Sequence, residues 1–146
     1  MRYEGDEIYD VIPNRRPLMI LDCIDIIDDS TAEGLIKLKE DAWYFECHYP
    51  GNPIFPVCLL VESMTQIFTP IFFNRTREIP VIYSLGAVKV NVGATIGEEI
   101  RLIATVNSNK RGVIAGKCEA YKMRDGREVL MTSIDITEVL KSDNTL

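Results

Sequence analysis

The chain contains one histidine, His48, and its most apolar stretch contains one carboxylate, Glu62, which follows fourteen residues later. Histidine titrates near neutral pH and is therefore the most common general acid or base in enzymes. The simpler alternatives are that His48 is structural and that Glu62 is a surface carboxylate or the partner of an arginine. Because glutamate is seldom buried among apolar residues without a task, the pair predicts acid–base chemistry.

The residues around Glu62 predict a buried helix over 56–70, with Pro56 in its first turn and Pro70 at its end. Apolar side chains cover nearly the whole circumference of this helix. The first N–H groups of a helix have no internal acceptor, and together with the helix dipole they can stabilise an oxyanion held there. Cys58 lies near this helix start, where a thiol can act as a nucleophile. Free cysteine is more often a packing residue, and we expect that role.

The rest of the chain alternates between apolar and polar residues and predicts strands. Residues 18–27 and 33–39 predict a hairpin around residues 28–30, preceded by a short helix over 6–12. Asp125-Gly126 is a strong hairpin signal within a meander of three antiparallel strands. The later strands are expected over 81–92, 100–106, 113–123 and 129–139, before a polar tail over 141–146. The pattern predicts an α+β fold, in which a curved antiparallel sheet of five or six strands wraps around one central apolar helix.

Length and composition predict a single domain over residues 1–146, with 47% hydrophobic and 26% charged residues. The start of the chain lacks the basic flank and apolar core of a signal peptide, and residues 57–73 are shorter than a bilayer span of roughly 20 residues. We therefore expect a cytoplasmic protein. The net charge of −6 argues against nucleic-acid binding. The four cysteines lack metal-ligand spacing, which predicts reduced thiols and no zinc site.

The residues from the histidine to the apolar helix form a dense block: His48-Tyr49-Pro50-Gly51-Asn52-Pro53-Ile54-Phe55-Pro56, followed by Leu59, Glu62, Met64 and Gln66. This block resembles the signature of the β-hydroxyacyl-acyl carrier protein dehydratases of fatty-acid synthesis, the FabZ-like proteins of the hotdog superfamily. The resemblance extends to residues 12–17, Asp22, Lys89 and Gly97. It implies a hotdog fold that forms a homodimer or a trimer of dimers, with the histidine of one subunit opposite the glutamate of the other beside an acyl tunnel.

The resemblance also implies an activity and residue roles. The enzyme would remove water from a (3R)-3-hydroxyacyl thioester on acyl carrier protein to give the trans-2-enoyl product, with no metal or dissociable cofactor. His48 would be the general base at C2, Glu62 would act at the C3 hydroxyl, and the backbone N–H of Val57 would bond the thioester carbonyl. The substrate would also contact Phe55, Pro56 and Cys58.

The chain departs from the family pattern at two glycine positions, where it has Cys47 and Val57, and Asn14 stands where a second histidine is common. Cys58 resembles the FabA-like dehydratase/isomerases, but that branch has Asp at the position of Glu62, which favours plain dehydration. Two alternatives stay open. One is a hotdog acyl thioesterase in which Glu62 activates water, and the other is a catalytically weak acyl-binding subunit.

The docking of an acyl carrier protein is a further expectation from the resemblance. Carrier proteins are acidic as a class and this chain is acidic too, so docking would need a local basic patch. The candidates for this patch are Lys89, Lys110 and Arg111.

Overall fold

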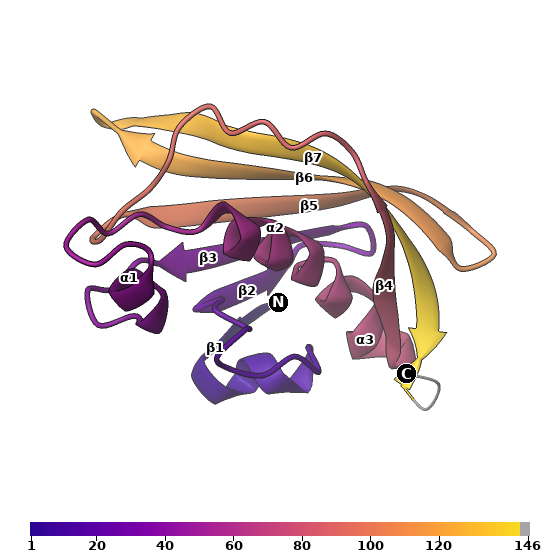
Figure 1. Ribbon diagram of the computed structural model, residues 1–146. Helices are drawn as coiled ribbons and strands as arrows, with labels where there is room; N and C mark the ends of the chain where they lie inside the picture. Colours follow the sequence, from indigo (N-terminus) through magenta and orange to yellow (C-terminus); the bar gives the residue numbers. More distant parts are fainter. Residues whose placement is uncertain (144–146) are drawn as a thin grey trace.

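The computed structural model describes residues 1–143 as one antiparallel sheet curled around a helical segment (Figure 1). The sheet has seven strands in the order β1-β2-β3-β5-β6-β7-β4. The predicted α+β class and the curved sheet around a central apolar helix are confirmed. The strands are β1 (Arg2–Glu4), β2 (Cys23–Ile26), β3 (Thr31–Lys37), β4 (Glu78–Leu85), β5 (Glu99–Lys110), β6 (Val113–Arg124) and β7 (Arg127–Ser142). The helices are η1 (Gly5–Asp10, a 3-10 helix), α1 (Trp43–Cys47), α2 (Val57–Gln66) and α3 (Thr69–Thr76).

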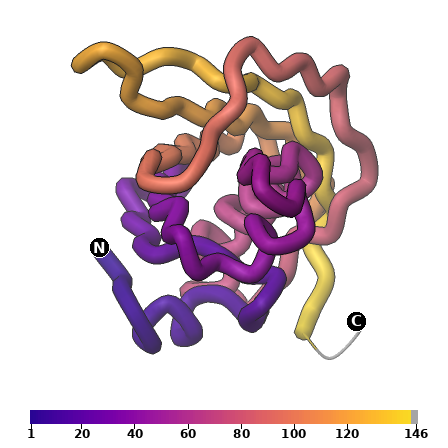
Figure 2. Tube along the Cα trace, turned by 60° about the vertical axis from the view of Figure 1, so that its left-hand side comes forward, coloured from indigo at the N-terminus to yellow at the C-terminus, as the bar shows by residue number. Residues whose placement is uncertain are grey.

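The inner face of the sheet follows the alternation of a strand, in which every second side chain points to the same side. On β5 the buried row includes Ile100 and Leu102, and on β6 it includes Ile114 and Cys118. Gly116 belongs to this inward row. A Cβ at this position would lie 2.5 Å from the Phe68 ring, so the glycine allows the helical segment to approach the sheet closely. Figure 2 shows the sheet curving over this segment, with the N-terminal residues on the opposite side.

The central helical segment is interrupted after Gln66, whereas the sequence predicted an unbroken helix over 56–70. A turn at Ile67 and Phe68 separates α2 from α3, and Pro70 lies in the first turn of α3. Pro70 therefore starts a helix, because a first-turn residue needs no N–H for the helical ladder. Pro56 is the N-cap of α2 and precedes its first turn. The run Val57–Thr76 is long and apolar enough to cross a membrane, but 72% of its apolar window is buried inside the protein, as in a core helix.

The predicted hairpins are present, but their strands begin and end at other residues than predicted. β2 pairs with β3, β5 to β7 form the meander, and a turn at Asp125 and Gly126 joins β6 to β7. Residues 18–22 lie outside β2, although Met19 and Leu21 are fully buried, because an apolar run signals burial without specifying a strand. The short elements β1 and α1 were not predicted. β7 continues to Ser142, so a polar tail does not begin at residue 141, and residues 144–146 lie outside the described part of the chain.

The strand predicted over 81–92 ends early. β4 stops at Leu85, and the chain then runs beside β7 as an irregular segment. Two backbone hydrogen bonds attach this segment to β7, from Gly86 N to Asp135 O (2.8 Å) and from Asn91 N to Met131 O (2.8 Å). β4 is the last strand in the sheet order, so its outer edge has no neighbouring strand within residues 1–143.

Candidate active site

His48 caps the C-terminus of α1, a helix of five residues. Its ring Nδ1 lies 2.9 Å from the backbone oxygen of Ile54. A carbonyl oxygen can only accept a hydrogen bond, so Nδ1 carries the proton and Nε2 of the neutral ring is the free acceptor. Ile54 N in turn donates to His48 O at 2.9 Å, which clamps both ends of the loop. The loop therefore holds the imidazole in the tautomer that suits a general base.

The loop between His48 and Pro56 is ordered by its own contacts. Tyr49 and Asn52 exchange two backbone hydrogen bonds, each 2.9 Å long, across a turn in which Gly51 has a φ of +73°. Only glycine adopts this left-handed conformation at little cost. The peptide bond between His48 and Tyr49 is cis, and their two rings stack with centroids 4.2 Å apart. One face of the His48 imidazole is therefore covered by the Tyr49 ring.

Glu62 lies on α2, half-buried, and its carboxylate is bound by a neighbour on the same helix. Gln66 Nε2 donates to Glu62 Oε1 at 2.7 Å, across one helical turn. Within residues 1–143 Glu62 takes part in no ion pair, so the alternative of an arginine partner is wrong. One carboxylate oxygen is therefore held by an amide, and the other is available to a ligand.

Glu62 opens onto a cavity of about 180 Å³ that involves α2, α3, β4 and β7. The other lining residues are Asn14, Thr65, Gln66, Thr69, Ile79, Pro80, Val81, Ile82 and Glu138. His48 is not among them, and no hydrogen bond joins His48 to Glu62 within residues 1–143. The two predicted catalytic groups therefore do not share this cavity in a single chain.

Glu138 is a buried carboxyl that the sequence reasoning missed. It is 1% exposed on β7, and neither of its oxygens has a hydrogen-bond partner within residues 1–143. Burial raises its pKa to about 8, because no cation or donor offsets the lost solvation. The signal was present in the strand alternation, since Glu138 continues the inward row of Ile134 and Ile136.

The start of α2 carries the other residues expected to bind substrate. Val57 is its first residue, so its N–H lacks an intrahelical acceptor, and its side chain is 41% exposed. Cys58 is also exposed in the single chain, and its expected packing along the acyl tunnel stays a prediction. Phe55 is buried, with its ring edge-to-face against Tyr44 at 5.2 Å. The contacts of Phe55, Pro56 and Cys58 with a substrate stay predictions.

The predicted basic patch is not a single patch. Lys110 and Arg111 lie at the β5–β6 turn, next to the backbone bond between Leu140 N and Gly112 O. Lys89 lies in the segment that is bonded to β7 at Asp135 and Met131. Asp135 and Leu140 are roughly 17 Å apart along a strand, so one carrier surface would have to span both places.

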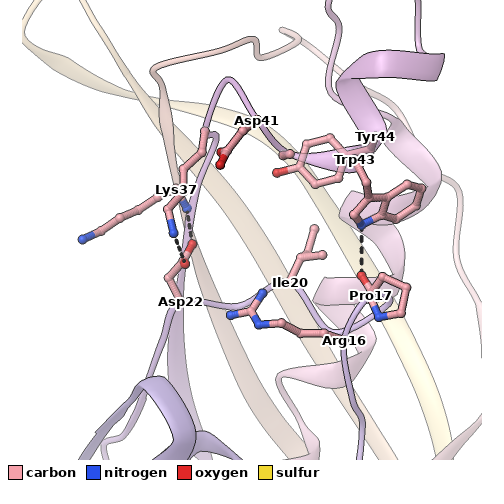
Figure 3. A pocket seen from close by; sticks show the side chains of 10 residues that line it. Arg16, Pro17, Ile20, Asp22, Lys37, Asp41, Trp43 and Tyr44 are labelled. Carbon is pink, nitrogen blue, oxygen red and sulfur yellow. Dashed lines mark hydrogen bonds and ion pairs between the residues drawn. The ribbon is translucent and has the colours of Figure 1, made fainter.

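A separate cavity of about 330 Å³ lies beside β3 and α1 (Figure 3). Its lining includes Arg16, Asp22 and Tyr44, and burial raises the pKa of Tyr44 to about 12. Asp22 accepts hydrogen bonds from Lys37 N at 2.7 Å and from Lys39 Nζ at 3.3 Å, so it acts within the fold. None of the predicted catalytic or substrate-binding residues lines this cavity.

The four cysteines of the chain lie apart from one another and form no disulfide within residues 1–143. Cys23, Cys47, Cys58 and Cys118 are all free thiols. Within residues 1–143 no three His, Cys, Asp or Glu side chains are grouped so that they could hold a metal ion.

Comparisons with known proteins assign the chain to a family. Residues 12–133 match the profile of the FabA-like domain. The chain is 28% identical over 123 residues to the 3-hydroxyacyl-[acyl-carrier-protein] dehydratase FabZ of Lactobacillus helveticus. This alignment covers 80% of this chain and 82% of the relative. It is 28% identical over 131 residues to the FabZ of Caldicellulosiruptor bescii, with coverages of 87% and 92%.

Solved structures show the same architecture. The dehydratase heterocomplex ApeI:P from Xenorhabdus doucetiae superposes with a TM-score of 0.72 at 13% identity, over 94% of this chain and 92% of that chain. Zebra fish thioesterase superfamily member 2 superposes with a TM-score of 0.66 at 15% identity, over 88% of each chain. At these identities the likeness shows the fold, and the predicted hotdog fold is confirmed.

Proposed function

The chain belongs to the FabA-like domain family, and we propose that it is a 3-hydroxyacyl-[acyl-carrier-protein] dehydratase of fatty-acid or related acyl-chain biosynthesis. It converts the (3R)-3-hydroxyacyl thioester to the trans-2-enoyl thioester and water. The observation that carries the proposal is His48 held in a base-competent tautomer at the family spacing from Glu62. The similarity to FabZ proteins supports the same activity. We place this single-domain protein in the cytoplasm, where acyl carrier protein would be its substrate carrier.

The chemistry divides among three groups. His48 Nε2 takes the proton from C2, and the electrons of that C–H bond become the C2=C3 double bond as the C3–O bond breaks. Glu62 gives a proton to the departing hydroxyl, which leaves as water. The Val57 N–H donates to the thioester oxygen while enolate character develops, and the helix dipole adds to this stabilisation. Preorganised groups of this kind need no rearrangement during the reaction.

We infer that the site is completed by a second copy of this chain. β4 is one of the two edge strands of the sheet, and its Ile82, Tyr83 and Leu85 are 44%, 77% and 38% exposed. A long apolar edge strand is a pairing surface. Val81 and Ile82 also line the cavity beside Glu62, so a copy paired at β4 would close that cavity. This homodimer would place His48 of the partner subunit opposite Glu62.

The activity is tested by following both products of an acyl carrier protein thioester of 3-hydroxybutyrate. Dehydration gives conjugated enoyl absorbance with no free thiol, whereas thiol release would identify a thioesterase. An absence of both products with acyl chains of every length tested would favour an acyl-binding subunit. His48→Ala should lower kcat by about 10²- to 10⁴-fold, the usual loss of a general base. The exposed neighbour Glu46→Gln is the matched control and should keep wild-type kcat.

The shared site is tested by mixing two inactive homodimers, His48→Ala and Glu62→Ala. A mixed dimer has one doubly damaged site and one intact site. With random pairing half of the dimers are mixed, so activity should recover to roughly a quarter of wild type if the sites act independently. Subunits are to be mixed by co-expression, because a large apolar interface exchanges slowly. Verified mixed dimers that are no more active than either parent would refute the composite site.

A further inference from the structure

Two buried polar groups face the cavity beside Glu62 without partners. Gln66 is 3% exposed, and while its Nε2 bonds Glu62, its Oε1 accepts no hydrogen bond within residues 1–143. Glu138 is 1% exposed, and neither of its oxygens is bonded there either. Both residues line the same cavity, Gln66 from α2 and Glu138 from β7. A buried polar group without a hydrogen bond costs free energy, so Gln66 Oε1 and the Glu138 carboxyl each require a hydrogen-bond partner.

The two groups are complementary. A neutral carboxyl has one O–H donor, and an amide oxygen is an acceptor. Burial raises the pKa of Glu138 to about 8, so this carboxyl is mostly neutral at pH 7. The cavity of about 180 Å³ also has room for a bridging water, which can complete the hydrogen bond where the two side chains do not meet directly.

We propose that Glu138 is a positioning residue for the catalytic carboxyl: through one bridging water it donates to Gln66 Oε1 and so keeps Gln66 Nε2 directed at Glu62. This inference rests on the proposed dehydratase function. Without the donor, the amide of Gln66 can turn over and present its oxygen to the oxygen of Glu62. With the donor, Glu62 Oε1 is held by the amide and Oε2 is directed to the substrate.

The proposed hydrogen bond from Glu138 to Gln66 depends on the charge of Glu138, because ionisation removes the donor and adds a negative charge to the cavity. Glu62 on α2 is the other titratable residue in the lining, and β4, α3 and the N-terminal segment contribute no ionisable side chain. On β6, Cys118 has its pKa raised by burial first and to a smaller extent by Glu119 and Glu138. In the proposed homodimer His48 of the partner subunit also faces Glu62. Because ionisation of Glu138 removes the donor to Gln66, kcat should fall as the pH rises past about 8.

The experiment compares Glu138→Gln with Glu138→Met in a steady-state dehydration assay between pH 6 and 9.5. Glutamine keeps an N–H donor and cannot ionise, so this variant should keep kcat within about twofold at pH 7 and lose the part of the alkaline fall that has the Glu138 midpoint near pH 8. Methionine removes the donor and should lower kcat about tenfold below pH 8 with KM unchanged, as expected for one lost hydrogen bond. The difference from wild type should shrink at higher pH, where Glu138 itself has lost its proton. A Glu138→Gln enzyme with the wild-type alkaline fall, or a folded Glu138→Met enzyme with full kcat, would overturn the proposal.

A measurement on wild-type protein separates this inference from the proposed function. The side-chain amide signals of Gln66, assigned by their loss in Gln66→Met, should shift in NMR spectra with the same midpoint as the Glu138 carboxyl carbon. They should not shift at that midpoint in Glu138→Gln. Coupled signals in a protein without dehydratase activity would refute the function and keep the contact. If the Gln66 amide signals do not shift at the Glu138 midpoint in wild type, the contact is refuted, whether or not the protein is active.

Discussion

Replacing Glu138 by glutamine should stabilise the protein, and the gain should grow with pH. The folded-state pKa of Glu138 is about 8, against 4.5 for an exposed glutamate, because burial removes solvent without supplying a partner. A carboxyl with a raised pKa contributes fully to stability below pH 4.5 and loses this contribution as the pH rises through 8. The reason is that the unfolded chain can ionise this group and the folded chain resists its ionisation.

The size of the effect follows from the shift. One pKa unit corresponds to about 1.4 kcal/mol, so the wild type should lose about 4 kcal/mol between pH 5 and pH 9 through this one group. Glutamine has nearly the same shape and does not titrate. The difference in unfolding free energy between Glu138→Gln and wild type should therefore rise by about 4 kcal/mol over the same range.

Urea denaturation at pH 5, 7 and 9 measures this difference, at one fixed protein concentration because association contributes to stability. The matched control is Glu99→Gln, which changes an exposed carboxylate on β5 and should give a difference that hardly varies with pH. If the Glu138→Gln difference is equally flat, the carboxyl of Glu138 is not buried and neutral, and the reasoning from its desolvation fails.

Two further predictions concern the surface and the core. Reversing the charges of Lys110 and Arg111 at the β5–β6 turn should raise KM several-fold for a carrier-linked substrate and leave KM for a short pantetheine thioester unchanged. The difference should shrink at high salt, and equal effects on both substrates would place carrier docking elsewhere. Gly116→Ala should destabilise the fold by about 1–3 kcal/mol in urea denaturation, because its Cβ would lie 2.5 Å from an aromatic carbon. Gly93→Ala, where a Cβ meets nothing within 4 Å, should cost far less, and equal losses would refute the overlap.

Local patterns were enough to predict most of the strands. The alternation in β5 to β7 and the turn at Asp125 and Gly126 depend on neighbours in sequence, and the structure has both. The predictions failed where one local sequence pattern is compatible with two structures. Pro70 can follow a helix or start one, and the apolar residues 18–22 can be buried with or without strand pairing. Only the packing of α3 and of the N-terminal segment resolves these choices.

The sequence by itself determined the candidate chemistry, because the residue types and spacing of His48 and Glu62 are properties of the chain. It also determined the helix start that carries Val57 N–H. The tertiary structure decided that Lys89 lies far from Lys110, and that Glu138 joins Gln66 in the cavity of Glu62. Strand alternation could assign Glu138 to the inner face, but the free energy of a carboxyl depends on what packs against it. That environment comes from segments distant in sequence, so it exists only once the sheet has closed around the helices.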